Sequence, residues 1–109
     1  MAWLLRDGQV LASVSLAGSL AERARGFSGR DAADGALYVS PTRFAHALGT
    51  GAPLDIAFVD EQLTVLSTCR LSRLRLGRFC RGAYGVIEAE AGAFERWALR
   101  PGDRLEIKR

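Results

Sequence analysis

The sequence has few of the residues that identify a metalloprotein, a disulfide-rich protein or a membrane protein. Among its 109 residues are two cysteines and one histidine, and its longest apolar runs, such as residues 2–5 and 56–59, are short. Such runs cannot span a bilayer, which takes about 20 apolar residues. Two thiols and one distant histidine cannot supply the four ligands of a structural zinc site. We therefore expect no metal, no other cofactor and no membrane partner.

A chain of this length can fold without staples, because it can bury roughly two thirds of its unfolded surface. Hydrophobic residues make up 49% of the chain and charged residues 25%, as in ordinary globular proteins. We predict one domain over residues 1–109. The N-terminus lacks a basic segment followed by a long apolar stretch, so we expect no signal peptide and a cytoplasmic location.

The positive charge is unevenly distributed. The net charge is +3, yet residues 62–87 contain no acid and five arginines: Arg70, Arg73, Arg75, Arg78 and Arg81. Such a stretch can contact the phosphates of nucleic acid or another acidic partner. It can equally be a solvated loop or an edge strand, where charge opposes edge-to-edge pairing. Because only Phe79 offers a nearby ring for stacking, the solvated reading is favoured over nucleic acid.

Alternating apolar residues and turn signals predict mainly strands. Asp7-Gly8 predicts a tight hairpin turn between strands over residues 3–6 and 9–16. Further strands are expected over 36–39, 44–48, the apolar stretch after Pro53, 63–71, 85–89 and 105–108. A capping box at Ser19 and Glu22 begins a short helix over residues 20–25, and a second helix is expected over 93–99. The fold class is therefore a single β-sandwich or β-barrel domain with two short helices.

Asp55 is the most informative residue, because it lies inside what is otherwise a buried strand. Burying an ionised carboxylate costs several kcal/mol unless a cation or several donors meet it. We expect Asp55 to pair with an arginine, His46 or backbone amides. Arg23 and Arg30 are the candidate counter-ions, and a structural ion pair is favoured over a role in binding substrate.

Several stretches follow one another in a recognisable order: Glu22-Arg23, Gly26-Phe27 with Arg30, residues 35–39, Pro53–Asp60, Val86–Gly92 and Leu99–Asp103. In this order they resemble the domain of unknown function number 192 family, an uncharacterised protein family. The resemblance covers nearly the whole chain and implies a small, mostly β domain without an established activity. Residues 45–50 depart from the family pattern, which has an aromatic and methionine-bearing stretch there, although one branch of the family also has a histidine where this chain has His46.

The candidate ligand site is a cleft where His46, Thr50 and Asp55 converge with Arg23 or Arg30. We favour a non-enzymatic module that binds an unidentified small ligand or protein. The alternative is a small hydrolase in which Asp55 orients His46 as general base. This alternative lacks a nucleophile, because the sequence around Ser28 does not have the form of a nucleophile elbow.

Cys69 and Cys80 are predicted to be free thiols, because the chain needs no disulfide at this size. Thiol titration of denatured, unreduced protein should find both, matching a sample that was reduced first. A difference between the two samples would contradict the prediction and the cytoplasmic location with it.

Overall fold

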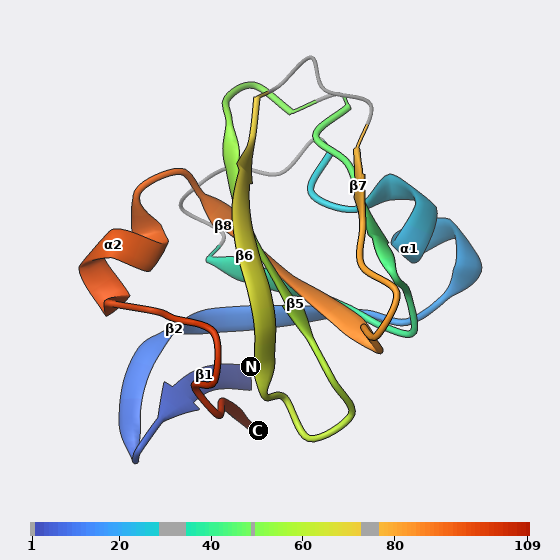
Figure 1. Cartoon of the computed structure of the whole chain (residues 1–109). Coiled ribbons are helices and arrows are strands. Elements are labelled where there is room, and N and C mark those ends of the chain that lie inside the picture. The colour runs from blue at the N-terminus through green and yellow to red at the C-terminus, as the bar shows by residue number, and fades with distance from the viewer. Residues whose placement is uncertain (1, 29–34, 49, 73–76) are drawn as a thin grey trace.

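The computed structural model describes residues 2–28, 35–48, 50–72 and 77–109. These residues form a compact, mainly β domain with two short helices, as predicted from the sequence (Figure 1). The elements in chain order are β1 (Ala2–Arg6), β2 (Gln9–Ala17), α1 (Leu20–Arg25), β3 (Ala36–Val39), β4 (Phe44–Ala45), β5 (Leu54–Val59), β6 (Val65–Leu71), β7 (Arg78–Phe79), β8 (Gly85–Glu90), α2 (Ala93–Trp97) and β9 (Glu106–Lys108).

Seven strands form one mixed sheet in the order β6-β5-β8-β3-β2-β1-β9, and β4 pairs with β7 in a second, two-stranded sheet. The β2–β3 pair is parallel, and α1 lies in the connection between these two strands. The other neighbours in the large sheet are antiparallel. Over the described ranges this sheet is not closed into a barrel: β6 and β9 are its two ends.

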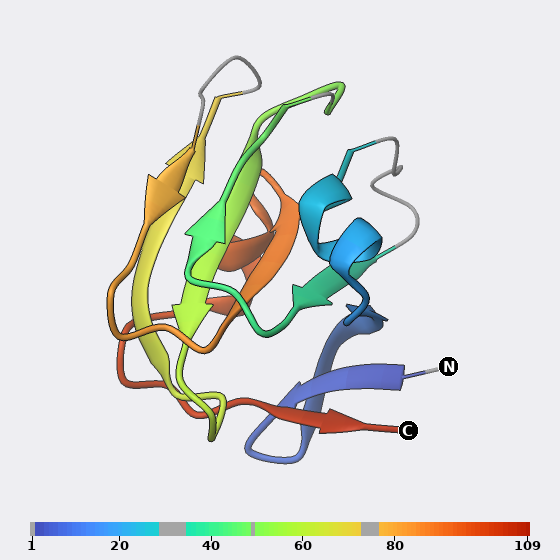
Figure 2. The same ribbon diagram turned by 90° about the vertical axis from the view of Figure 1, so that its right-hand side faces the viewer.

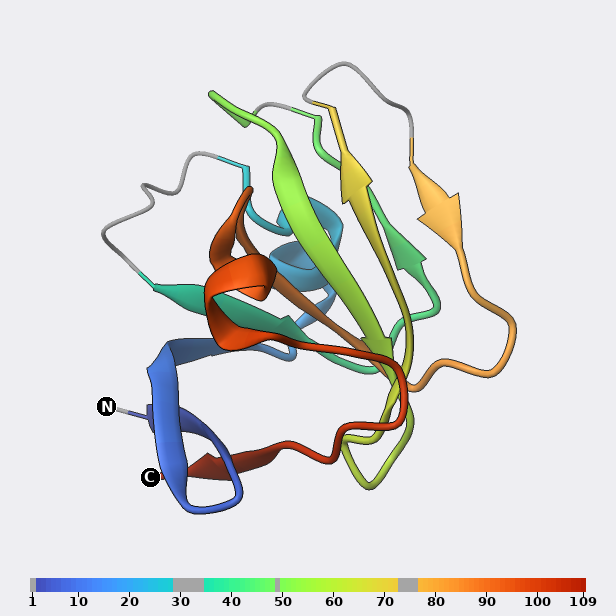
Figure 3. The ribbon, with the colours of Figure 1, turned by 60° about the vertical axis from the view of Figure 1, so that its left-hand side comes forward.

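The large sheet has apolar residues on both faces, because α1 and α2 lie on opposite sides of it (Figures 1 and 3). Successive side chains of a strand point to opposite faces. The α2-side core contains, among others, Ala57, Val59, Ile87, Ala89 and Phe94. The α1-side core contains, among others, Phe27, Leu37, Ile56, Phe58 and Val86. All six residues of β5 are buried, as expected for a central strand between two cores.

The two-stranded sheet covers part of the α1-side core. Ala45 of β4 is 1% exposed and belongs to that core, and Cys80, just after β7, packs against it. Figure 2 views the molecule from this side, with β4 and β7 in front of the strands of the large sheet and α1 beside them.

The local signals of the sequence are confirmed at the first hairpin and at α1. Asp7 and Gly8 have φ angles of 52° and 79°, which a tight primed turn requires. The Ser19 hydroxyl accepts from the Glu22 amide at 3.1 Å, and the Glu22 carboxylate accepts from the Ser19 amide at 3.1 Å. These bonds hold the pKa of Glu22 below its usual value.

Four elements are shorter than predicted. The strands expected over 63–71 and 105–108 begin at Val65 and at Glu106. The strand expected over 44–48 ends at Ala45, because the Leu48 amide turns back to donate to Nδ1 of His46 at 3.2 Å. The helix expected over 93–99 ends at Trp97, because Ala98 adopts a left-handed conformation that caps it. Cys69 and Cys80 are both half-buried, and neither forms a disulfide. No helix in the described part of the chain is long and apolar enough to cross a membrane.

Phe58 is a large fully buried side chain of the α1-side core, at 1% exposure. Phe58→Ala should lower the free energy of unfolding by about 3 to 5 kcal/mol, because it removes buried area and leaves a cavity. Leu20→Ala is the control, since Leu20 is 77% exposed. Denaturant melts should show almost no change for the control. Equal losses for the two variants would contradict this assignment of the core.

Candidate functional site

Asp55 is held by an arginine and by two backbone amides. It is 4% exposed. Its Oδ1 accepts from Nε of Arg70 at 2.9 Å, and its Oδ2 accepts from the amides of Gly92 at 2.9 Å and Phe94 at 3.1 Å. The prediction that Asp55 finds an arginine or amides is confirmed. The prediction that Arg23 is the counter-ion is wrong, because Arg70 pairs with Asp55 instead. Arg30 lies outside the described residues.

Arg70 lies directly opposite Asp55 in the β5–β6 pair. Counting outward from the turn at residues 60–64 would pair position 55 with position 69. An irregularity between Phe58 and Val59 shifts the register by one residue and places Arg70 opposite Asp55 instead, so the sequence alone could not identify this partner. The hydrogen bond from Arg70 to Asp55 raises the pKa of Arg70. The Arg70 side chain is 52% exposed, so water also solvates this charge.

The contacts of Asp55 give it a structural role at the start of α2. Gly92, the residue that precedes the helix, makes no side-chain cap hydrogen bond of its own. The first amides of a helix have no partner within the helix and need an external acceptor. Asp55 accepts from two of them and thereby joins β5, β6 and α2.

His46 lies on the other side of the sheet. Its Nε2 donates to the Ala24 carbonyl at 2.8 Å, and its Nδ1 accepts from the Leu48 amide at 3.2 Å. One tautomer, with the proton on Nε2, makes both bonds. His46 therefore satisfies a carbonyl near the end of α1, and the predicted His46–Asp55 pair is wrong.

Thr50 and Arg23 do not join Asp55 either. The Thr50 hydroxyl lies 2.8 Å from the Ala47 carbonyl and 2.9 Å from the Ala52 carbonyl, to either of which it can donate. Arg23 is half-buried on α1. The prediction of one cleft shared by these residues is wrong, because Asp55 faces α2 whereas His46 and Arg23 lie on the α1 side.

The sequence analysis missed Glu88, a carboxylate on β8 that is 2% exposed. Its Oε1 lies 3.4 Å from the position that a β-carbon on Gly26 would take, and Nε2 of His46 lies at the same distance from that position. Gly26, His46 and Glu88 therefore meet at the end of α1, although they are far apart in the sequence. Glu88 lies in the apolar stretch 85–89, the same signal that drew attention to Asp55.

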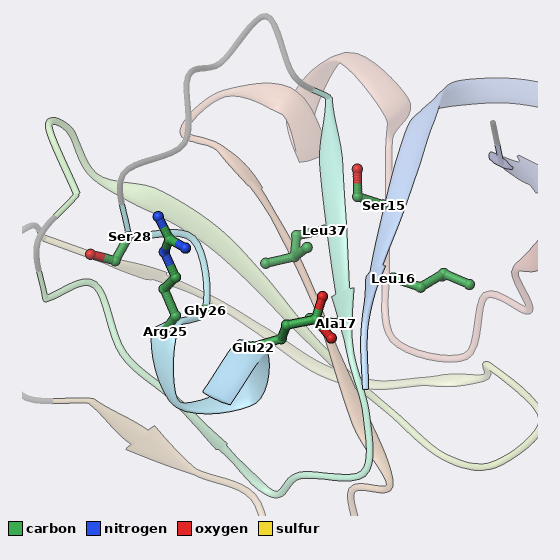
Figure 4. A pocket seen from close by; sticks show the side chains of 8 residues that line it. All are labelled: Ser15, Leu16, Ala17, Glu22, Arg25, Gly26, Ser28 and Leu37. Atoms are coloured by element: carbon green, nitrogen blue, oxygen red, sulfur yellow. The ribbon is translucent and has the colours of Figure 1, made fainter. Parts of the chain in front are cut away.

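A cleft of about 270 Å³ adjoins this cluster, between α1 and strands β2 and β3 (Figure 4). Gly26 belongs to both the cluster and the cleft wall. Side chains of β2 and β3 line one side, and those of α1 and the residues after it line the other. The lining residues are Ser15, Leu16, Ala17, Glu22, Arg25, Gly26, Ser28 and Leu37.

The predicted basic patch is divided between two places. Arg70 pairs with Asp55 on the α2 side, whereas Arg78 and Arg81 are exposed in and just after β7. Arg73 and Arg75 lie outside the described residues. In the ranges that the structure describes, no group of three or more His, Cys, Asp or Glu side chains is placed to hold a metal ion.

The family model DUF192, Uncharacterized ACR, COG1430, matches residues 2–107. The chain belongs to this family. The resemblance drawn from the sequence is thereby confirmed. No curated protein matches the chain.

Two solved structures share this DUF192 fold. A protein of Sinorhizobium meliloti 1021, described as a "putative transcription regulator", is 26% identical, with a TM-score of 0.80 over 96% of this chain and 90% of that one. A protein of unknown function from Novosphingobium aromaticivorans DSM 12444 is 22% identical, with a TM-score of 0.79 over 96% of this chain and 82% of that one. The second likeness concerns the fold alone.

Asp55→Asn should lower the free energy of unfolding by about 1 to 3 kcal/mol, the cost of weakening charge-assisted hydrogen bonds to a buried acceptor. A larger loss is not expected, because the half-exposed Arg70 is solvated once its partner is neutral. Glu90→Gln is the control, since it breaks an exposed ion pair with Arg96 and should change stability by less than about 0.5 kcal/mol. Denaturant melts measure both. A loss for Asp55→Asn no greater than for the control would contradict the structural role.

Proposed function

We propose that this domain is a non-enzymatic binding module that holds a small polar ligand in the cleft between α1 and strands β2 and β3. The observation that carries the proposal is the meeting of Glu88 and His46 behind Gly26, which itself lines that cleft. Burying a carboxylate is costly, and polar groups that converge beside a concave surface are typical of ligand sites. Gly26 and Glu88 also lie in stretches on which the family resemblance rests.

The lining of the cleft suggests the chemistry of the ligand. Arg25 and the hydroxyls of Ser15 and Ser28 suit an anionic group, whereas the ionised Glu22 suits an ammonium group. The volume of about 270 Å³ lies just below the range of about 300 to 1,000 Å³ found for drug-sized ligands. A small molecule with both an amine and an acid group, such as an amino acid, fits these constraints best.

A binding role is supported over the hydrolase alternative by the state of His46. Both ring nitrogens are occupied by backbone groups, so the ring has no free position for taking a proton from water or a nucleophile. Asp55, which the hydrolase would use to orient the ring, faces α2 instead. A regulatory role that depends on ligand binding would agree with the description of the Sinorhizobium meliloti protein. A cytoplasmic location belongs to the same proposal.

The experiment is a nuclear magnetic resonance titration of the ¹⁵N-labelled chain with each common amino acid at millimolar concentration. At least one should shift the amide signals of Ala17, Gly26 and Leu37, because these residues line the cleft. Arg25→Gln should abolish the shifts, because it removes the cation that the acid group of the ligand needs.

Arg104→Gln is the matched control, because it makes the same change of charge at an exposed position that does not line the cleft. It should leave the titration unchanged. Three results would each overturn the proposal: no shift with any amino acid, shifts that gather around α2, or an equal loss in the two variants.

A further inference from the structure

The outer face of the two-stranded sheet presents two aromatic rings. Phe44 of β4 lies directly opposite Phe79 of β7. Residues directly opposite each other in an antiparallel pair share a face. The neighbouring Ala45 points inward, at 1% exposure, so Phe44 and Phe79 point outward, and they are 48% and 60% exposed. The sequence alone showed one ring beside the arginines, and strand pairing brings a second.

Exposed cations lie near this aromatic pair, although Arg78 pairs with the inward-pointing Ala45 and so leaves its strand on the face opposite the rings. Arg43, Arg78 and Arg81 are all exposed. Arg43 and Cys80 are joined by a backbone hydrogen bond of 2.8 Å, which extends the pairing of the two strands and brings Arg43 close to Arg81 along the chain. Residues 42–48 and 77–84, which supply β4, β7 and the described residues beside them, contain three arginines and no aspartate or glutamate. The surface around β4 and β7 is therefore built from positive and aromatic side chains.

These features select one class of partner. Single exposed apolar residues are ordinary, but two aromatic rings in register among arginines match the surfaces that bind single strands. On such surfaces bases stack on aromatic rings, and arginines contact the phosphates. An apolar protein partner would not require the arginines. A regular duplex would not use the rings, because its bases are already stacked on one another.

We propose that the outer face of the β4–β7 sheet binds single-stranded nucleic acid, with Phe44 and Phe79 stacking on bases and Arg81 and the neighbouring Arg43 contacting phosphates. Stacking accepts any base, because every base has a π-face, so binding has little sequence preference. It weakens with salt, because each phosphate contact releases counter-ions. This surface is separate from the ligand cleft, whose lining residues come from β2, α1 and β3.

The test is fluorescence anisotropy of a labelled oligothymidylate with the full chain over a series of salt concentrations. Phe79→Ser should weaken binding by about 5- to 100-fold, as expected for the loss of one stacking platform. Trp3→Ser is the matched control, because Trp3 is an aromatic residue of β1 at 42% exposure. Phe79 is chosen over Phe44, since the Phe44 ring packs closely against Gly77 and its loss could disturb the sheet.

Arg81→Gln should reduce the slope of log affinity against log salt by about 0.7, the value for one phosphate contact on a single strand. Arg104→Gln, the same change at another exposed position, should leave the slope unaltered. Thermal melts of all four variants establish that they are folded.

Four results would overturn the proposal. They are no binding at low salt, equal effects of Phe79→Ser and Trp3→Ser, equal affinity for a duplex of the same length, and a concentration-dependent dimer that Phe79→Ser abolishes while oligothymidylate does not bind. The last result would assign the surface to a second copy of the chain.

Discussion

The hydrogen bonds of Asp55 join three elements of the fold: strands β5 and β6 and helix α2. One carboxylate accepts from a side chain on β6 and from two amides at the start of α2, while its own backbone lies in the central strand β5. A five-residue helix is too short to be stable by itself. Its position therefore depends on packing by residues such as Phe94 and on the acceptor that Asp55 provides. The buried carboxylate of Asp55 therefore helps to hold α2 against the α2-side core.

The sheet separates two acids with different roles. Asp55 on β5 and Glu88 on β8 belong to adjacent rungs of one strand pair, yet their side chains face opposite sides. The contacts of Asp55 are those of a structural group. Glu88 lies beside His46 and Gly26, and of these three residues Gly26 lines a cleft. A buried carboxylate is thus not by itself evidence of function, and its neighbours decide between the two roles.

Much of the fold could be predicted because the deciding signals are local. The Asp7-Gly8 turn and the Ser19–Glu22 capping box depend on a few adjacent residues, and both are confirmed. The candidate site was harder to predict, because it depends on which strands pair and on which face of the sheet each side chain lies. His46 and Asp55 are near in sequence, but the large sheet lies between them. Glu88 and Gly26 meet only because β8 lies beside β3, an arrangement that no local pattern encodes. Likewise, Phe44 and Phe79 share a face only because β4 pairs with β7.

The pairing of β5 with β8 also restricts how the chain can fold. In the native register Asp55 pairs with Ala89, and Ile56 with Glu88. A shift of the register by one residue moves every side chain of a strand to the opposite face of the sheet. If β5 were reversed in this way, Asp55 would enter the α1-side core, away from Arg70 and the amides of α2, and Ile56 would lie where those donors need an acceptor. Such an arrangement would leave one buried charge and two backbone amides without hydrogen-bond partners. The same carboxylate that holds the native sheet together therefore makes the nearest misaligned sheet costly, so that a strand apolar on both faces still has a single register.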